Sequence, residues 1–251
     1  MIYFVGAGPG APDLITLRGK ELISRADEII YAGSLVNPAL LSWAKPGCAV
    51  YDSASMTLEA VIERFAAAER KNRLTVRLHT GDPSLYGAIR EQMDRLDALG
   101  FAYEVVPGVS SFCAAAAALK AEYTLPGLSQ TLIITRVAGR TGMPAHEDLR
   151  LLASHQASMA IFLSAALLGE LREALLEGGY PADTPAAIVY KASWPEEQVL
   201  RGTVDTLPRM GEESGITKTA LVLLGRFLGA GYERSRLYDP GFTHEYRKQT
   251  E

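Results

Sequence analysis

The sequence predicts an α/β protein made of two α/β domains, residues 1–122 and residues 123–251. Two observations predict this class. Short apolar segments with strand character alternate with helical segments along the chain. Turns rich in glycine and proline directly follow three of the predicted strands in the first half. Such turns at strand ends are typical of an open α/β sheet that binds a small molecule at its edge.

The first domain is predicted to contain four strands and four helices. Thr16 is a candidate N-cap for the first helix, and Thr57 opens a helix whose apolar residues form one stripe. Gly100 is the expected C-terminal stop of the third helix. In chain order the elements are strand 1–5, helix 16–26, strand 28–32, the helix from Thr57, strand 74–79, helix 86–99, strand 103–106 and helix 110–121.

The boundary of the second domain is predicted at a linker, Tyr123 to Ser129, which contains Pro126-Gly127. A glycine-rich rim on the first of two domains favours a ligand site in the cleft between the domains. The tail after Gly229 has no assigned role. The predicted strands are 130–136, 159–164, 186–191, 198–202 and 219–224, and the predicted helices are 145–154, 167–177 and 204–213.

Composition excludes several kinds of partner. The 251 residues carry a net charge of -4, so the chain has no basic footprint for a nucleic acid. No apolar run approaches membrane-spanning length, and the N-terminus lacks a basic leader. We therefore expect a cytoplasmic protein with neither nucleic acid nor membrane as a partner. The four histidines and two cysteines lack metal-ligand spacing, so no protein-bound metal is expected.

The first turn, Gly6-Ala7-Gly8-Pro9-Gly10-Ala11, fits the dinucleotide fingerprint G-x-G-x-x-[GA]. Its context argues against that interpretation. Pro9 and Pro12 remove two backbone donors, and the helix is expected to start only near Thr16. The segment Tyr31-Ala32-Gly33-Ser34 also lacks the acid that would bind the ribose. A ligand without phosphates is favoured over a nucleotide and over a tight turn that binds nothing.

The second and third turns carry polar side chains beside glycine. In Thr80-Gly81-Asp82-Pro83, the Asp82 carboxylate either caps the following helix or accepts hydrogen bonds from a ligand. In Pro107-Gly108-Val109-Ser110-Ser111, N-capping explains one hydroxyl and leaves the other for a ligand.

Together, and in this order after strands, the three turns resemble the signature of the tetrapyrrole methylases. These are S-adenosylmethionine-dependent enzymes of corrin and sirohaem synthesis. The resemblance spans nearly the whole chain. It implies S-adenosyl-L-methionine folded in the cleft between two domains, S-adenosyl-L-homocysteine as its product, a tetrapyrrole substrate and a homodimer.

Within the family, the chain is most similar to the branch that methylates C11 of precorrin-4 to give precorrin-5 in cobalamin biosynthesis. Gly33 resembles the oxygen-dependent branch, since relatives of the anaerobic cobalt route tend to have an acid there. The cobalt-containing substrate is the alternative. The stretches that carry this similarity are 6–16, 31–36, 79–89, 135–141 and 189–195.

The resemblance also assigns cofactor contacts residue by residue. For Leu163 and Ala220 the alternative is plain core packing. The contacts fall on Pro9, Thr80, Gly81, Asp82, Leu85, Ser110, Ser111, Leu163, Ala192 and Ala220.

A precorrin carries several carboxylates, so its site needs cations despite the acidic total charge. Arg136, Arg140 and Lys191 lie at predicted strand ends or in the following loops and are the candidate substrate contacts; solvent-exposed charge is the alternative. No general base is identified. Two other functions stay open, a nicotinamide-dependent oxidoreductase and a non-catalytic protein that binds a tetrapyrrole.

Overall fold

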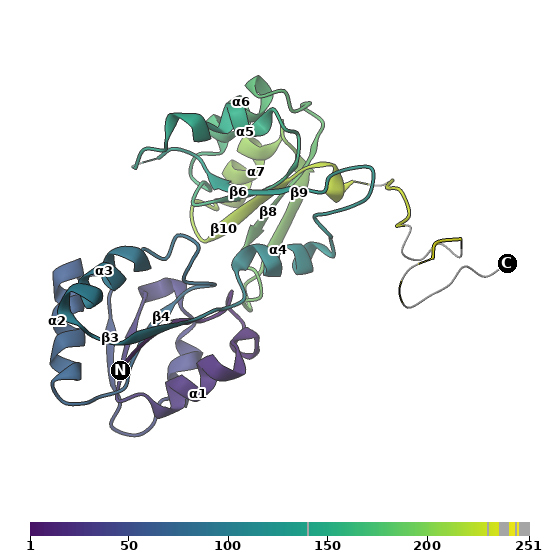
Figure 1. The fold of residues 1–251 in the computed structure, drawn as a ribbon. Helices are drawn as coiled ribbons and strands as arrows, with labels where there is room; N and C mark the ends of the chain where they lie inside the picture. The colour runs from purple at the N-terminus through teal and green to yellow at the C-terminus, as the bar shows by residue number, and fades with distance from the viewer. Residues whose placement is uncertain (140, 230, 236–240, 244, 246–251) are drawn as a thin grey trace. The chain divides into compact units, whose positions relative to one another are not determined.

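The computed structural model describes residues 1–139, 141–229, 231–235, 241–243 and 245. They form two compact units, each with a five-stranded sheet (Figure 1). The first unit is Met1–Ala114 together with Lys191–Glu197, and the second is Ala115–Tyr190 with the described residues from Gln198 onward. The α/β class is confirmed. The observed division comes earlier in the chain than the predicted one at residues 122 and 123, and the return of Lys191–Glu197 to the first unit was not predicted.

The first sheet is parallel throughout, in the order β3-β2-β4-β1-β5. Strand β1 lies between β4 and β5, so the carboxyl ends of these three strands are neighbours. The four predicted strands are confirmed, and β3 was missed. The strands are β1 (Ile2–Gly6), β2 (Glu28–Tyr31), β3 (Ala49–Asp52), β4 (Thr75–His79) and β5 (Tyr103–Val106).

The helices of this half begin and end largely where the sequence places them. The Thr16 and Thr57 hydroxyls accept hydrogen bonds from the backbone of Gly19 and Ala60, which confirms both helix starts. Helix α3 begins three residues later than predicted, at Ile89. The helices of this half are α1 (Leu17–Arg25), α2 (Leu58–Glu69), α3 (Ile89–Leu99), α4 (Ser111–Leu119) and the 3-10 helices η1 (Pro12–Leu14), η2 (Gly33–Leu35) and η3 (Pro38–Trp43).

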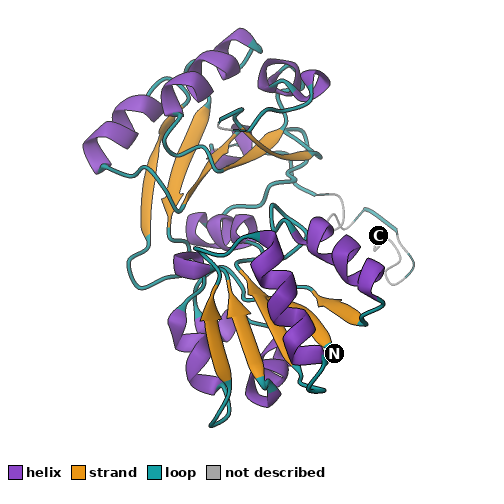
Figure 2. Ribbon diagram, turned by 90° about the vertical axis from the view of Figure 1, so that its left-hand side faces the viewer, coloured by secondary structure: helices purple, strands orange, loops and turns teal. Residues whose placement is uncertain are grey.

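Helices flank both faces of the first sheet (Figure 2), and the alternation of side chains along β1 explains why. Ile2 and Phe4 point into the cluster under α2 and α3, where Phe65 is fully buried. Val5 points to the opposite cluster, which includes Ile23 of α1. The two-sided burial keeps the strand ends, and the turns that follow them, in fixed places.

The second sheet is mixed, in the order β6-β7-β10-β8-β9. Strands β6 and β7 are parallel, whereas β10 runs antiparallel to both β7 and β8, and β9 antiparallel to β8. All five predicted strands are confirmed. They are β6 (Leu132–Arg136), β7 (Ser158–Phe162), β8 (Pro185–Tyr190), β9 (Gln198–Thr203) and β10 (Ala220–Leu224).

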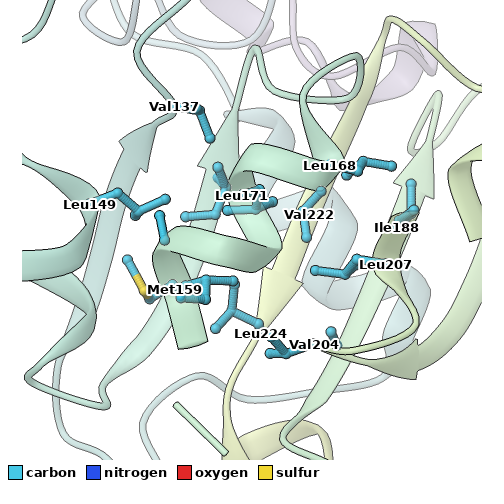
Figure 3. Close-up of a cluster of buried hydrophobic side chains, with 14 of the residues drawn as sticks. Val137, Leu149, Met159, Leu168, Leu171, Ile188, Val204, Leu207, Val222 and Leu224 are labelled. Carbon is cyan, nitrogen blue, oxygen red and sulfur yellow. The ribbon is translucent and has the colours of Figure 1, made fainter. Parts of the chain in front are cut away.

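One face of this sheet packs against helices, with Met159, Leu171 and Val222 fully buried between the layers (Figure 3). The predicted helix 145–154 is instead two short elements, because the Asp148 carboxylate accepts a hydrogen bond from Arg150 N–H and starts a new helix. The helical elements are α5 (Leu149–Ala153), α6 (Leu168–Glu177), α7 (Leu207–Ser214), η4 (Ala145–Glu147) and η5 (Arg226–Leu228).

The segment expected to be a linker is packed within the second unit. Ser158 of β7 donates its hydroxyl to the Tyr123 carbonyl and its N–H to the Ser129 hydroxyl. Within the described ranges, no helix combines the length and apolar composition needed to cross a bilayer.

Candidate functional site

The three predicted turns meet through their glycines at the carboxyl ends of β4, β1 and β5. A Cβ atom on Gly6 would lie 2.6 Å from the Gly108 Cα and 2.7 Å from the Gly81 carbonyl oxygen. A Cβ on Gly108 would lie 2.2 Å from the same oxygen. No side chain fits at these distances, so the three turns touch backbone to backbone and only glycine is compatible with the contact.

The first and second turns are also joined by backbone hydrogen bonds. Gly81 N–H donates to the Gly8 carbonyl at 2.8 Å, and Gly8 N–H donates back to Gly81 at 3.3 Å. Ala7 N–H donates to the His79 carbonyl at 2.7 Å. Gly8 and Gly81 have φ values of +77° and +59°, which a side chain would strain. The two turns therefore form one continuous rim.

Asp82 ties the third turn to this rim. One carboxylate oxygen accepts from the Ser84 backbone N–H and hydroxyl, and the other accepts from Gly108 N–H at 2.8 Å. Burial alone raises the pKa of Asp82, but the hydrogen bonds from Ser84 and Gly108 outweigh it and lower the pKa overall. Asp82 does not cap the following helix, which begins only at Ile89, so that alternative was wrong.

The other predicted residues of this rim are placed around it. Pro9 and Ser110 are buried, while Thr80, Leu85 and Ser111 are half-buried. A Cβ on Gly81 would lie 3.5 Å from the Ser110 Cα and the Ser111 nitrogen, an ordinary contact distance. The second turn and the start of α4 are therefore brought together as the sequence suggested.

The geometry disfavours a dinucleotide at the first turn. Helix α1 starts at Leu17, separated from Gly10 by the 3-10 helix η1, so its N-terminus does not open at the glycines. Within the part of the chain that the structure describes, no three His, Cys, Asp or Glu side chains are grouped as metal ligands.

A second set of predicted residues lies at one edge of the second sheet. Leu163 follows β7, and Ala220 begins β10, which is antiparallel to β7 with Val222 opposite Ile161. Leu163 and Thr219 have φ values of +53° and +56°. Left-handed backbone at non-glycine residues costs about 1–3 kcal/mol each and is concentrated at functional sites. The strain marks this edge as a candidate binding surface.

Core packing is excluded for Leu163, which is 68% exposed. Ala220 is half-buried and packs against the core cluster of the second sheet, so packing does account for its size. Ala192, also predicted as a cofactor contact, is buried within Lys191–Glu197, which belongs to the first unit.

The described candidate cations have intramolecular partners. The Arg136 guanidinium donates to the carbonyls of Val137, Thr141 and Gly142, and thus holds the loop after β6. Lys191 forms an ion pair with Glu196 at 3.6 Å. Arg140 lies outside the described residues.

Sequence reasoning missed a buried polar pair on β4. Arg77 and His79 are 7% and 4% exposed, and the Arg77 guanidinium donates to Gln92 and to the Ile30 carbonyl. Burial lowers the pKa of Arg77 to about 10, and burial with the nearby Arg77 charge lowers the pKa of His79 to about 3. His79 is therefore neutral directly before the second turn. Strands of a parallel sheet are buried on both faces, so their sequences do not show which side chains lie in apolar surroundings. The burial of His79 was therefore not predicted.

Trp194, Ser193 and Asn37 were also missed. Their side chains hydrogen-bond to the Pro9 carbonyl, the Ala11 N–H and the Gly10 carbonyl. The partners are far apart in the chain, so no local pattern could have shown these contacts.

Comparison with known proteins places the chain among curated relatives over nearly its full length. It is 52% identical over 248 residues to a cobalt-precorrin-4 C(11)-methyltransferase of Methanocaldococcus jannaschii, covering 98% of this chain and 96% of the relative. It is 48% identical over 248 residues to a precorrin-4 C(11)-methyltransferase of Pseudomonas aeruginosa, covering 98% of each chain.

Solved structures show the same fold. The X-ray structure of a cobalt precorrin-4 methyltransferase superposes with a TM-score of 0.89 at 45% identity, over 91% of this chain and 96% of that one. A uroporphyrin-III C-methyltransferase of Thermus thermophilus, complexed with S-adenosyl homocysteine, gives 0.75 at 28% identity, over 90% and 92%. Residues 1–208 match the family described as tetrapyrrole (corrin/porphyrin) methylases. The chain belongs to the tetrapyrrole methylase family.

Proposed function

We propose that this chain transfers a methyl group from S-adenosyl-L-methionine to C11 of a precorrin-4 ring in cobalamin biosynthesis. The observation that carries the proposal is a sequence identity of 48–52% to two enzymes named for this reaction, over 98% of the chain. The three glycine turns support it as well, since they match the family's signature and meet at one end of the first sheet.

The first unit fits an adenosyl cofactor. Gly6 and Gly108 let the three turns pack backbone to backbone into one rim, which side chains at these two positions would prevent. The bound cofactor supplies a methyl group already activated as a sulfonium. The residues proposed to hold it are Pro9, Thr80, Gly81, Leu85, Ser110, Ser111 and Ala192 of the first unit and Leu163 and Ala220 of the second.

Asp82 remains a proposed cofactor contact and also has a role within the rim. Its carboxylate already accepts three hydrogen bonds from the protein, so it orients the turns around the cofactor. Methyl transfer depends on holding the donor and the acceptor carbon in line, and a rim fixed before binding lowers the cost of that alignment. The work of the protein is positioning, which agrees with a chain in which no general base was identified.

Arg136, Arg140 and Lys191 are proposed contacts for the substrate carboxylates. The Arg136 guanidinium has five N–H donors, and its bonds to three loop carbonyls leave donor capacity for a carboxylate. By the family resemblance we also propose a homodimer located in the cytoplasm.

Gly33 is the residue on which the choice between the metal-free and the cobalt-containing substrate was based. Its φ of +57° lies in the left-handed region, and a Cβ there would lie 3.0 Å from the Ala54 side chain. The local backbone favours glycine at this position, and the preference for the metal-free substrate of the oxygen-dependent route rests on the family resemblance. The chain is similar over its length to one relative named for cobalt-precorrin-4 and to one named for precorrin-4.

The deciding experiment supplies the purified protein with methyl-deuterated S-adenosylmethionine and either precorrin-4 or cobalt-precorrin-4. Mass spectrometry should find a single labelled methyl group at C11 of one of these substrates. Binding of the tetrapyrrole without any transfer would support the non-catalytic alternative. Binding of NADH but not of S-adenosylhomocysteine would support an oxidoreductase, and either result contradicts the proposal.

A further inference from the structure

The segment Lys191–Glu197, here called the returning segment, connects two strands of the second sheet but belongs to the first unit. It contacts the first glycine turn at residues 9–11. The indole N–H of Trp194 donates to the Pro9 carbonyl at 2.9 Å. The Ser193 hydroxyl accepts from Ala11 N–H at 3.0 Å. Two adjacent side chains thus hold the turn on either side of Gly10.

Gly10 leaves the space that the indole ring fills. A Cβ on Gly10 would lie 2.0 Å from Cδ1 and 2.2 Å from Nε1 of Trp194. The φ of Gly10 is not in the left-handed region, so the ring is the obstacle to a larger residue. The carbonyl of Gly10 accepts a hydrogen bond from the side-chain amide of Asn37 at 2.8 Å.

The returning segment is itself held in a strained, specific shape. Lys191 and Ser193 have φ values of +46° and +69°, which non-glycine residues adopt only where surrounding contacts enforce them. Ser193 N–H donates to the Glu197 carboxylate at 2.7 Å, and Trp194 N–H donates to the Lys191 carbonyl at 2.9 Å. The Lys191 ammonium lies 5.2 Å from the centre of the Trp194 ring.

These contacts fall on the part of the turn that follows Gly8, where Asn37 also holds the Gly10 carbonyl. Gly8 is already paired with Gly81, whereas Pro9 has no N–H and Gly10 has no side chain. Trp194 is only half-buried, so it contributes less to the core than a buried tryptophan would. Its hydrogen bond, in contrast, sets the direction of the Pro9 carbonyl and ring.

We propose that Trp194 is a positioning residue for S-adenosylmethionine. Its indole N–H holds Pro9, and Ser193 holds Ala11, in the orientation that the cofactor meets. The inference rests on the proposed function, because Pro9 is there a cofactor contact. Trp194 itself acts through the turn and is not assigned any contact with the cofactor.

The test compares Trp194→Phe, which keeps a ring but removes the donor, with wild type. Loss of one hydrogen bond to the rim should raise the dissociation constant of S-adenosylhomocysteine about fivefold to tenfold. The KM for S-adenosylmethionine should rise by a similar factor while kcat at saturation stays within about twofold. Ser193→Ala, which removes the other contact, should act in the same direction. Urea denaturation of each variant gives the effect on folding separately.

A double-mutant cycle tests the pairing of Gly10 with the indole. Gly10→Ala alone should weaken S-adenosylhomocysteine binding at least about tenfold, because the new methyl group must displace the ring. In a Trp194→Ala background the same change should alter binding by less than about twofold, since the obstacle is gone. Equal losses in both backgrounds would contradict the proposed geometry.

The chain has two tryptophans, so a Trp43→Phe variant leaves Trp194 as the single indole. Its emission should change saturably with S-adenosylhomocysteine, and the emission of Trp43 in Trp194→Phe should not. If wild type fails to bind S-adenosylhomocysteine by calorimetry, the proposed function fails. If wild type binds and Trp194→Phe and Ser193→Ala bind equally well, whatever their stability, the positioning role of Trp194 is refuted and the proposed function stands.

Discussion

The carboxylate of Asp82 accepts a hydrogen bond from the backbone N–H of Gly108 at 2.8 Å, across 26 positions of sequence. One side chain of the second glycine turn thereby holds the third, and its other oxygen holds Ser84 of its own turn. The rim is thus maintained by a charged group that does not need the ligand to be bound. Hydrogen bonds to a charged acceptor are among the stronger ones in proteins.

Replacing Asp82 by Ala should therefore destabilise the fold as well as weaken ligand binding. The variant leaves Gly108 N–H without its acceptor, which costs about 1–3 kcal/mol of the free energy of unfolding. Ser84→Ala, which removes only the hydroxyl and keeps the bond to Gly108, should cost less. Urea denaturation and calorimetry with S-adenosylhomocysteine measure the two effects, and equal stability of Asp82→Ala and wild type would contradict the role assigned to Asp82.

The pH dependence of this contribution has a definite sign. The pKa of Asp82 is lowered in the folded protein, so the native state holds the charged form more strongly than the unfolded chain does. Its stabilisation is present above the ordinary value of 3.8 and is lost as pH falls below that value through the folded pKa. The difference in stability between wild type and Asp82→Ala should shrink over that range.

Gly108→Ala should be far more damaging than a glycine substitution elsewhere. The new Cβ would lie 2.2 Å from the Gly81 carbonyl oxygen and 2.8 Å from the Gly6 Cα, both backbone atoms that cannot turn away. We expect a loss of more than about 3 kcal/mol or failure to fold. Gly169→Ala is the matched control, because Gly169 is exposed in α6 and nothing lies within 4 Å of its new Cβ.

That control should keep its stability or gain slightly, since alanine favours the helix. Thermal denaturation of both variants gives the comparison. A Gly108→Ala protein as stable as Gly169→Ala would show that the turns do not touch as described.

How far the sequence predicts this fold can be read from single residues. Thr16 and Thr57 carry their own capping chemistry, so the helices they open were placed correctly. Strand β3 is short and half-exposed, and nothing local distinguishes it from a loop until β2 pairs with it. The start of α3 was misplaced because Tyr86 and Ala88 adopt positive φ values of +56° and +49°, which their residue types do not announce.

The site shows the same division. The glycines were found because bare backbone after a strand is a local signal. What Asp82 does with its carboxylate, and which residue fills the space beside Gly10, depend on segments distant in the chain. Long-range contacts of this kind leave no periodicity to detect.

His79 should make the protein sensitive to mild acid. Its pKa is lowered from 6.5 to about 3, first by burial and then by Arg77, so the unfolded chain binds the proton more readily than the folded protein. The contribution of neutral His79 to the free energy of unfolding is complete above pH 6.5. It decreases as pH falls toward 3, by up to about 1.4 kcal/mol per pH unit.

His79→Leu, which removes the titrating group at a position whose Nε2 has no partner among the described residues, should remove this slope. The measurement is the urea midpoint between pH 6.5 and pH 4.5 for wild type and variant. His146→Gln, at an exposed position, serves as control and should keep the wild-type slope. A wild-type slope that persists in His79→Leu would assign the acid sensitivity to other groups.

Leu163 offers a way to separate strain from binding at the edge of the second sheet. The residue is 68% exposed with a φ of +53°, so the fold gains little from its side chain and is strained by its backbone. Leu163→Gly should relieve about 1 kcal/mol of strain, offset in part by the greater freedom of the unfolded chain. We expect stability to stay level or rise slightly while affinity for S-adenosylhomocysteine falls.

Lys120→Gly is the control, since Lys120 has the same φ of +53° directly after α4 and is outside the proposed site. It should show the same change in urea stability with unchanged affinity. If both variants bind alike, the exposed leucine contributes nothing to the cofactor site, and its strained backbone needs another explanation.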